Sequence, residues 1–147
     1  FGTGQSSYLY QTFVTERKLF TDISAAVTGT ADEGVFQISG RPVEGVSIEE
    51  ADAALSDYLY GFKFDSTLPH DLQKVKNAAE SVLLYNEIKI DDRATNLAVW
   101  ETLDSVERFL DERQLYFDVT EEQMRRLTSE LLTEEKSNTL FYKAKES

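Results

Sequence analysis

Histidine, cysteine and paired carboxylates are the side chains that could supply metal or acid–base chemistry in this chain. The 147 residues include one histidine, His70, so two-histidine metal sites and the His-pair zinc motifs are excluded within the chain. His70 falls in the first turn of a predicted helix, beside Asp71 and on its solvent-facing side, which is typical of a surface residue. The absence of cysteine excludes disulfides, thiolate nucleophiles and Cys-ligated zinc.

Acidic pairs recur along the chain, and each pair stands at a predicted helix end. The pairs are Asp91/Asp92, Glu49/Glu50, Glu121/Glu122 and Glu134/Glu135. Carboxylates at such positions cap helices or are solvated, whereas a glycosidase pair needs a defined separation and one raised pKa. No Ser or Thr lies in a Gly-x-Ser-x-Gly setting. The residue types therefore predict no catalytic, cofactor-binding or metal-binding residue, and this chain alone is not expected to be an enzyme.

A glycine turn precedes the first predicted helix. Gly2-Thr3-Gly4 leads into it, with Ser6 or Ser7 as its cap. Such a turn can hold phosphate at a helix N-terminus. The lysine of a phosphate-binding loop is missing and no strand is visible before the turn, so a purely structural turn is the favoured interpretation.

The overall charge argues against a nucleic-acid partner. The formal net charge is −12, whereas contacts to phosphates need clustered Lys and Arg. We interpret the acidic surface as one that confers solubility, and a lining that attracts basic peptides is the alternative. No run approaches the roughly 18 apolar residues of a membrane span, and no signal segment opens the chain. The cytoplasm and the bacterial cell envelope therefore both stay open as compartments.

The longest periodic segment is a predicted helix over Leu68–Ile90. Its apolar stripe consists of Leu68, Leu72, Val75, Ala79, Val82 and Leu83. These residues recur at steps of three and four, so they share one helical face on which a sheet could pack. Ser66 or Thr67 is expected to cap this helix, and Pro69 is tolerated in its first turn.

The other predicted elements surround this helix in sequence. Before it we expect a helix after Ser7 that buries Leu9, Phe13 and Val14 and ends in Arg17 and Lys18, and then a hairpin of strands over Phe20–Thr28 and Val35–Ser39, with a turn over 29–34 and an end at 41–45. A helix opened by a Ser47–Glu50 capping box and closed by Gly61 follows the hairpin. After the Leu68–Ile90 helix we expect a helix from Asp91-Asp92 through Leu103, a break near Asp104-Ser105, a helix over Val106–Tyr116, a helix with a Thr120/Gln123 capping box and a Val119/Met124 staple, and a β-prone run over Asn138–Lys143 that could return to the sheet. This order predicts an α+β fold, an antiparallel sheet with helices packed on one face.

Two segments near the N-terminus carry a family resemblance. Phe1–Tyr10 is similar to the Leu-Gly-Gly-Gly-x-x-Ser-x-Leu-(Tyr/Phe) turn and helix in the non-catalytic repeat of the pitrilysin/insulinase family of zinc metallopeptidases. Phe13–Ala25 resembles the Leu-Arg-Glu-x-x-Gly-Leu-Ala-Tyr-Ser-Val segment of that repeat. Further segments resemble it in the same order: Gly34–Ile38, Ser47–Ala51, Asp71–Asn77, which matches the Glu-Leu-x-x-x-Lys step of the family, and Val119–Gln123.

The resemblance implies a role in a larger enzyme. Members of this family build a clamshell around a peptide chamber, and one half carries zinc on an inverted His-x-x-Glu-His motif. This chain lacks that motif, so residues 1–147 are expected to be one truncated, metal-free C-terminal domain that starts after the family's first strand and helix. Zinc is expected in the catalytic half, which would be the partner, with peptides as substrates.

The resemblance also shows a departure. At the positions where active members present Arg and Tyr to the substrate, this chain has Thr15 and Thr21, and Arg17 would point to a different side of its helix. No substrate-binding residue is therefore carried over. An inactive structural or interaction subunit is the alternative function, and an unrelated acidic α+β binding module is the third. A sheet edge left open by the truncation also predicts a homodimer of the fragment.

Overall fold

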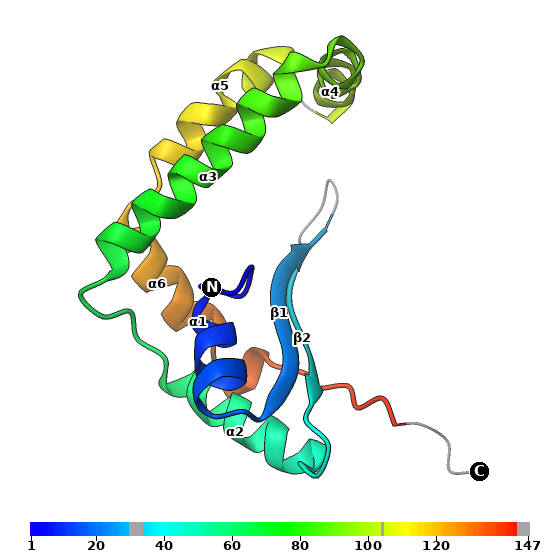
Figure 1. Cartoon of the computed structure of the whole chain (residues 1–147). Coiled ribbons are helices and arrows are strands. Elements are labelled where there is room, and N and C mark those ends of the chain that lie inside the picture. Colours follow the sequence, from blue (N-terminus) through cyan, green and yellow to red (C-terminus); the bar gives the residue numbers. More distant parts are fainter. Residues whose placement is uncertain (30–33, 104, 144–147) are drawn as a thin grey trace. The chain divides into compact units, whose positions relative to one another are not determined.

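The computed structural model describes residues 1–29, 34–103 and 105–143, and for residues 86, 87, 103 and 108–110 it describes the backbone alone. The chain forms an α+β fold whose contacts divide it into two compact units (Figure 1). The first unit is Phe1–Gly61 with Glu134–Ser147, and the second is Phe62–Thr133. The expectation of a single domain stays a prediction.

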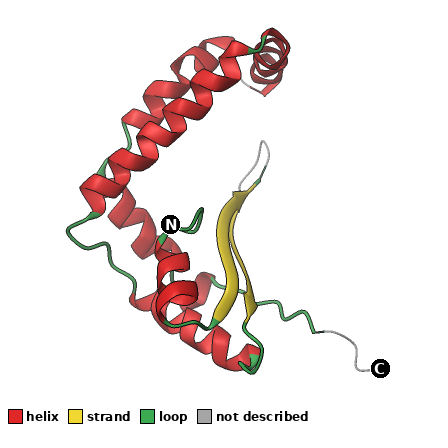
Figure 2. Cartoon of the chain, viewed as in Figure 1, coloured by secondary structure: helices red, strands yellow, loops and turns green. Residues whose placement is uncertain are grey.

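The first unit combines a two-stranded sheet with short and long helices (Figure 2). Its elements are α1 (Tyr8–Tyr10), a π-helical continuation η1 (Gln11–Glu16), β1 (Phe20–Thr28), β2 (Val35–Pro42), α2 (Ile48–Gly61) and a 3-10 turn η2 (Glu134–Lys136). Ser7 caps α1, since its hydroxyl accepts a hydrogen bond from the Tyr10 backbone N–H at 3.3 Å. The predicted first helix is thus confirmed, but its second half has the wider π-helical form.

The core of the first unit lies between β1 and the helices. Leu9 and Phe13 are fully buried, and they are joined by Ile23 and Ala25 of β1 and by Ala51 of α2. The Phe13 ring meets those of Phe20 and Tyr58 edge to face, with centroids 5.6 and 5.2 Å apart. Full burial of a side chain such as Leu9 stabilises the fold by about 1.5–3 kcal/mol.

The hairpin follows the alternation in the sequence. β1 and β2 are antiparallel, with Ala25 opposite Ile38, and the face that carries these two residues packs on the core. The other face carries Ser24, Gln37 and Ser39, which are exposed. β2 runs on to Pro42 instead of ending at Ser39. Part of the predicted turn, residues 30–33, lies outside the described residues.

The predicted strand over Asn138–Lys143 is wrong. This segment has no regular structure, and the side chains of Leu140 and Tyr142 are 93% and 92% exposed. Side chains hold it to α2: Lys143 Nζ lies 2.6 Å from Glu49 Oε1, and the hydroxyls of Ser137 and Tyr60 are 2.6 Å apart. A β-prone sequence forms a strand when its side chains pack against neighbouring residues, and the exposed side chains of this segment do not.

The second unit is helical. It consists of α3 (Leu68–Ile88), α4 (Ile90–Leu103), α5 (Val106–Phe117) and α6 (Glu121–Leu131). Polar contacts join α3 to α5, because Arg113 pairs with Glu80 and Lys76 Nζ donates to the Phe117 carbonyl at 2.7 Å. Four predicted helices are therefore confirmed, with α4 and α5 separated at Ser105. Asp104, the other residue of the predicted break, lies outside the described residues.

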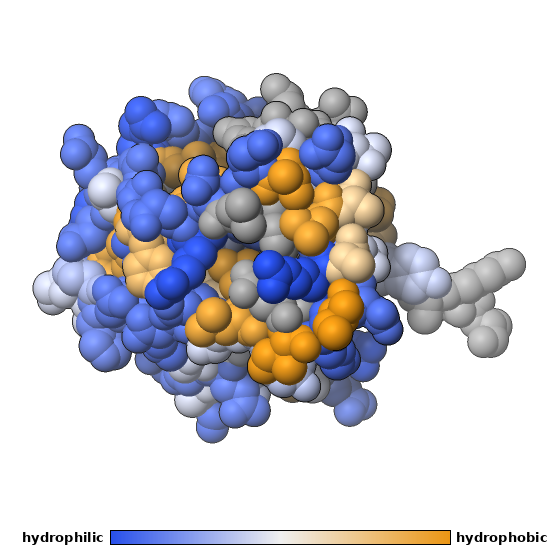
Figure 3. Space-filling view, turned by 90° about the horizontal axis from the view of Figure 1, so that it is seen from above, coloured by the Kyte–Doolittle hydropathy of each residue, from blue (hydrophilic) through white to orange (hydrophobic). Residues whose placement is uncertain are grey.

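Helix α3 packs with α4, α5 and α6 of its own unit. That a sheet packs on its apolar stripe stays a prediction. Leu68 is buried, whereas Val75 and Val82 are both 59% exposed. Part of the apolar face of α3 is therefore exposed. Figure 3 shows apolar residues, in orange, between hydrophilic ones on one face of the molecule.

The predicted side-chain caps form at α1, α2 and α6 but not at α3. The Thr120 hydroxyl accepts from the Gln123 N–H at 3.2 Å and the Gln123 side chain accepts from the Thr120 N–H at 2.8 Å, which is the predicted capping box. At α2, Ser47 Oγ accepts from the Glu50 N–H at 3.1 Å. At α3, Thr67 stands at the predicted N-cap position, but its side chain makes no capping hydrogen bond. Its backbone N–H and its hydroxyl both donate to Asp65 Oδ1, each at 2.7 Å.

Candidate functional site

The acidic pairs and the histidine occupy the helix ends that the sequence predicts. Glu49/Glu50, Asp91/Asp92 and Glu121/Glu122 lie in the first turns of α2, α4 and α6, and Glu134/Glu135 lie in η2. The His70 side chain is 84% exposed, with Nδ1 3.5 Å from Asp71 Oδ1. Over residues 1–29, 34–103 and 105–143, no group of three or more His, Asp or Glu side chains is placed to hold a metal ion.

Two carboxyl groups have pKa values lowered by local partners. A hydrogen bond from Lys143 lowers the pKa of the Glu49 carboxyl, and hydrogen bonds from Thr67 lower that of Asp65. In contrast, partial burial raises the pKa of Glu112 on α5. The Glu49 carboxylate binds the C-terminal segment and the Asp65 carboxylate stabilises a turn. Their lowered pKa values therefore have structural causes and do not indicate a catalytic site.

The glycine turn is explained by packing. A Cβ on Gly2 would lie 2.4 Å from the Ala25 Cβ, so glycine is required for the turn to approach β1 this closely. The Ala25 backbone N–H donates to the Gly2 carbonyl at 3.1 Å, and the Thr3 hydroxyl donates to the Ala25 carbonyl at 3.2 Å. Gly4 has a positive φ of 84°, which glycine adopts without strain. These contacts support the structural interpretation of the turn.

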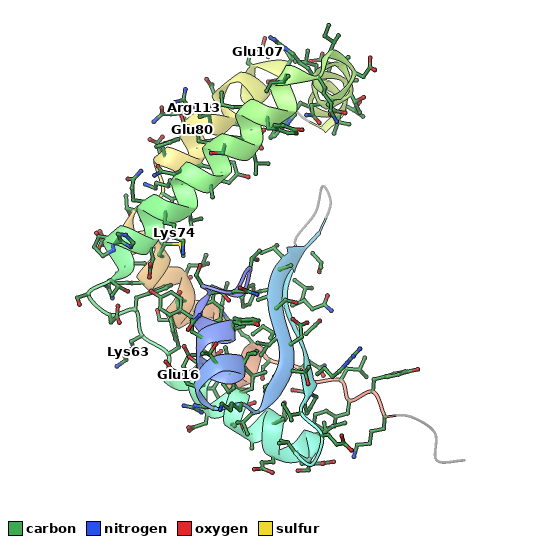
Figure 4. All side chains as sticks on the ribbon, viewed as in Figure 1. Glu16, Lys63, Lys74, Glu80, Glu107 and Arg113 are labelled. Carbon is green, nitrogen blue, oxygen red and sulfur yellow. The ribbon has the colours of Figure 1, made fainter. Side chains whose placement is uncertain are left out.

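The corner where η1 leads into β1 carries Thr15 and Thr21, the two positions that the resemblance singles out. Both residues are exposed, Thr15 on η1 and Thr21 on β1. The chain turns between them at Lys18, which has a φ of 53°, a conformation that side chains other than glycine rarely adopt. Backbone of this kind recurs at functional sites, as do short π-helical stretches. Figure 4 shows this part of the chain, with Glu16 labelled at the end of η1.

Arg17 contributes a cation at the same corner. Its guanidinium carbon lies 5.3 Å from the Phe13 ring centroid and 5.7 Å from that of Tyr58. Cation–π contacts of this kind orient the side chain while leaving its N–H groups able to bind an acceptor. The Thr12 hydroxyl also donates to the Tyr58 hydroxyl oxygen at 3.3 Å. The sequence predicted only a favourable helix-end charge for Arg17, since no local pattern reveals a ring contributed by α2.

The chemistry available at this corner is recognition. Exposed threonine hydroxyls and an oriented guanidinium can bind carbonyl or carboxylate oxygens of an extended peptide. No nucleophile paired with a base was predicted, and the carboxylates of Glu49 and Asp65 have structural partners. The described helices also include none long and apolar enough to cross a lipid bilayer.

Comparison with known proteins bears on the fold. No family model and no curated protein sequence matches this chain. Its structure is similar to that of a protease from Helicobacter pylori, with a TM-score of 0.71 and 20% identity over 88% of this chain and 31% of that chain. It is also similar to a "putative zinc protease" from Bordetella pertussis Tohama I, with a TM-score of 0.75 and 14% identity over 92% of this chain and 74% of that one. At these identities the likeness establishes a shared fold, one found in zinc-protease-like proteins.

Proposed function

We propose that this chain is the metal-free, C-terminal domain of a zinc-dependent metalloendopeptidase of the pitrilysin/insulinase family. The observation that carries the proposal is the fold that the chain shares, over most of its length, with the Helicobacter pylori and Bordetella pertussis proteins. The order of the resembling sequence segments supports the same family. The single histidine fits a domain that leaves the zinc ligands to another half of the enzyme.

In this proposal the domain forms chamber wall and part of the substrate-binding surface. A zinc ion in the other half would activate the attacking water. The η1–β1 corner then contacts the peptide, with hydroxyl donors at Thr15 and Thr21 and the oriented Arg17 guanidinium. These groups bind and orient an extended chain, a contribution that lowers the entropy cost of reaching the reacting geometry.

The experiment is cleavage of a mixed peptide library. Three samples are compared: this chain alone, a zinc-bearing half with a His-x-x-Glu-His motif alone, and the two together. We expect cleavage in the mixture only, and loss of cleavage on addition of a chelator. The matched control is a zinc-bearing half in which the Glu of its motif is replaced by Gln, which should assemble but not cleave. Cleavage by this chain alone would overturn the proposal, since one histidine cannot build the zinc site.

A catalytically inactive structural or interaction subunit is the second candidate function. Thr15 and Thr21 favour it, because active members of the resembling family have Arg and Tyr at these positions. If this candidate holds, the mixture forms a stable complex that cleaves no peptide. Replacing Thr15→Arg and Thr21→Tyr together would then be the direct test of whether these positions limit activity. Cleavage by the unmodified mixture would exclude the inactive subunit.

A further inference from the structure

The two outer edges of the hairpin differ in what covers them. Residues Phe1–Thr3 lie along the outer edge of β1 and pair with it at Ala25, through the Gly2 carbonyl and the Thr3 hydroxyl. The close approach at Gly2 leaves no room there for a further strand. β2 is the other edge, and in the described part of the sheet its one neighbouring strand is β1.

The register identifies the backbone groups on the outer edge of β2. Because the Ala25 N–H points toward Gly2, it points away from β2, and Ala25 and Ile38 form a pair without mutual backbone hydrogen bonds. The N–H and C=O of Ile38 therefore point away from β1. By the alternation of a strand, the same holds for Phe36 and Gly40. These groups face the side of β2 on which the described sheet has no strand.

The side chains of β2 do little to protect this edge. Natural edge strands are blunted by charged residues, especially Lys, or by Pro within the strand. From Val35 to Gly40 β2 has no charged residue, and its Pro42 is the last residue of the strand. Val35 is 65% exposed, and the neighbouring outward face carries only the uncharged Gln37 and Ser39.

The charge pattern of β2 allows a second copy of this chain to occupy this edge. The formal net charge of −12 makes two copies repel each other over most of their surface. β2 offers a stretch without any acid, so two copies can approach there at low electrostatic cost. A two-stranded sheet is also marginally stable, and one of three or more strands is more so. An antiparallel strand edge is self-complementary, as a two-fold symmetric contact requires.

We propose that β2 pairs with β2 of a second copy in antiparallel register, with Ile38 opposite Ile38 on the two-fold axis, to form a continuous four-stranded sheet. In this register Phe36 of one copy lies opposite Gly40 of the other, and their backbone N–H and C=O groups exchange hydrogen bonds. Gln37 lies opposite Ser39 of the other copy, and Val35 lies opposite Arg41. No like charges face each other across the pair.

The test is sedimentation of the full chain over a wide concentration range, with variants that place charges across the proposed pair. The wild-type chain should associate from monomer to dimer. The double variant Gln37→Lys/Ser39→Lys, and likewise Gln37→Glu/Ser39→Glu, places like charges opposite each other twice and should raise the dimer dissociation constant by at least about fivefold. An equimolar mixture of the two variants should restore the dimer, because opposite charges then meet.

A control variant separates this contact from net charge. Gln73→Lys/Asn77→Lys changes two exposed residues of α3 and alters the net charge by the same amount as the lysine pair on β2. It should associate at least as well as the wild-type chain, since a less negative charge weakens repulsion. An equal loss of dimer in this control would overturn the proposed pairing.

Amide hydrogen exchange gives an independent readout. The amides of Phe36, Ile38 and Gly40 should become protected as the concentration rises, whereas those of Gln37 and Ser39, which face β1, should be protected at every concentration. A monomer at all concentrations would overturn the proposal. So would a dimer that leaves the three amides unprotected, or one that the charge variants and their mixture do not alter.

Discussion

Gly2 is the residue at which the N-terminal turn and β1 come closest. Replacing Gly2→Ala would place a Cβ 2.4 Å from the Ala25 Cβ, against backbone and a buried side chain that cannot yield freely. We expect the variant to lose about 1–3 kcal/mol of unfolding free energy in urea titrations. The control is Gly61→Ala, where a Cβ would meet nothing within 4 Å at the end of α2. That variant should be neutral or stabilised by up to about 1 kcal/mol.

Glu49 is the residue whose titration reports how the C-terminal segment is held. The hydrogen bond from Lys143 lowers the pKa of Glu49 in the folded chain. The contact therefore stabilises the folded state fully at pH values above the pKa of Glu49 in the unfolded chain, and this stabilisation is lost as the pH falls through the pKa in the folded chain. In an NMR titration we expect the Glu49 carboxyl midpoint below the ordinary value of 4.5. Lys143→Met should raise this midpoint, whereas Lys136→Met should not. An unchanged midpoint in Lys143→Met would contradict the contact.

At the level of elements, the Thr120/Gln123 capping box is the signal that fixes the start of α6. Thr120→Ala removes the side-chain acceptor for the Gln123 N–H and should lower the unfolding free energy by about 1 kcal/mol, measured by thermal or urea denaturation. Ser129→Ala in the same helix is the matched control and should be neutral, because alanine is the better helix former at an exposed interior position. Equal losses in both variants would show that the cap has no special role.

Elements that depend on nearest neighbours were predictable from the sequence. The capping box of α6, the Ser47 cap of α2 and the alternation of β1 each follow from residues a few positions apart. At α3, the Thr67 hydroxyl donates to Asp65 and makes no capping hydrogen bond, a choice of partner that propensity alone does not decide. The π-helical form of η1 likewise has no signature among its residues.

Elements that depend on distant partners were not predictable. Whether Asn138–Lys143 forms a strand depends on whether a strand far away in the sequence pairs with it, which its own residues do not decide. The same holds for the candidate site. The positions of Thr15 and Thr21 follow from the resemblance, but the rings under Arg17 come from both η1 and α2 and are brought together only by the fold.

At the scale of the whole molecule, the division into two units has consequences for folding. The buried core of the first unit contains Leu9, Phe13 and Ile23, whereas the described buried apolar residues of the second are Phe64 and Leu68. The second unit therefore relies more on helix propensity and on polar links such as the Arg125 guanidinium, which donates to the Phe64 and Asp65 carbonyls at 2.5 and 3.1 Å. Hydrogen bonds of this kind add only modestly to the free energy of unfolding, because water solvates their donors well when the chain is unfolded.

This difference predicts that residues Phe62–Thr133 fold alone as a helical unit of low stability. Circular dichroism of the isolated segment should show helix that melts over a broad range. Within it, Arg113→Glu should lower the melting midpoint, because it places two carboxylates where α3 and α5 meet, and adding Glu80→Arg should restore the midpoint by reversing the pair. An unstructured segment would mean that the first unit is needed to fold the second. A reversed pair that restores nothing would mean that this ion pair does not join the two helices in solution.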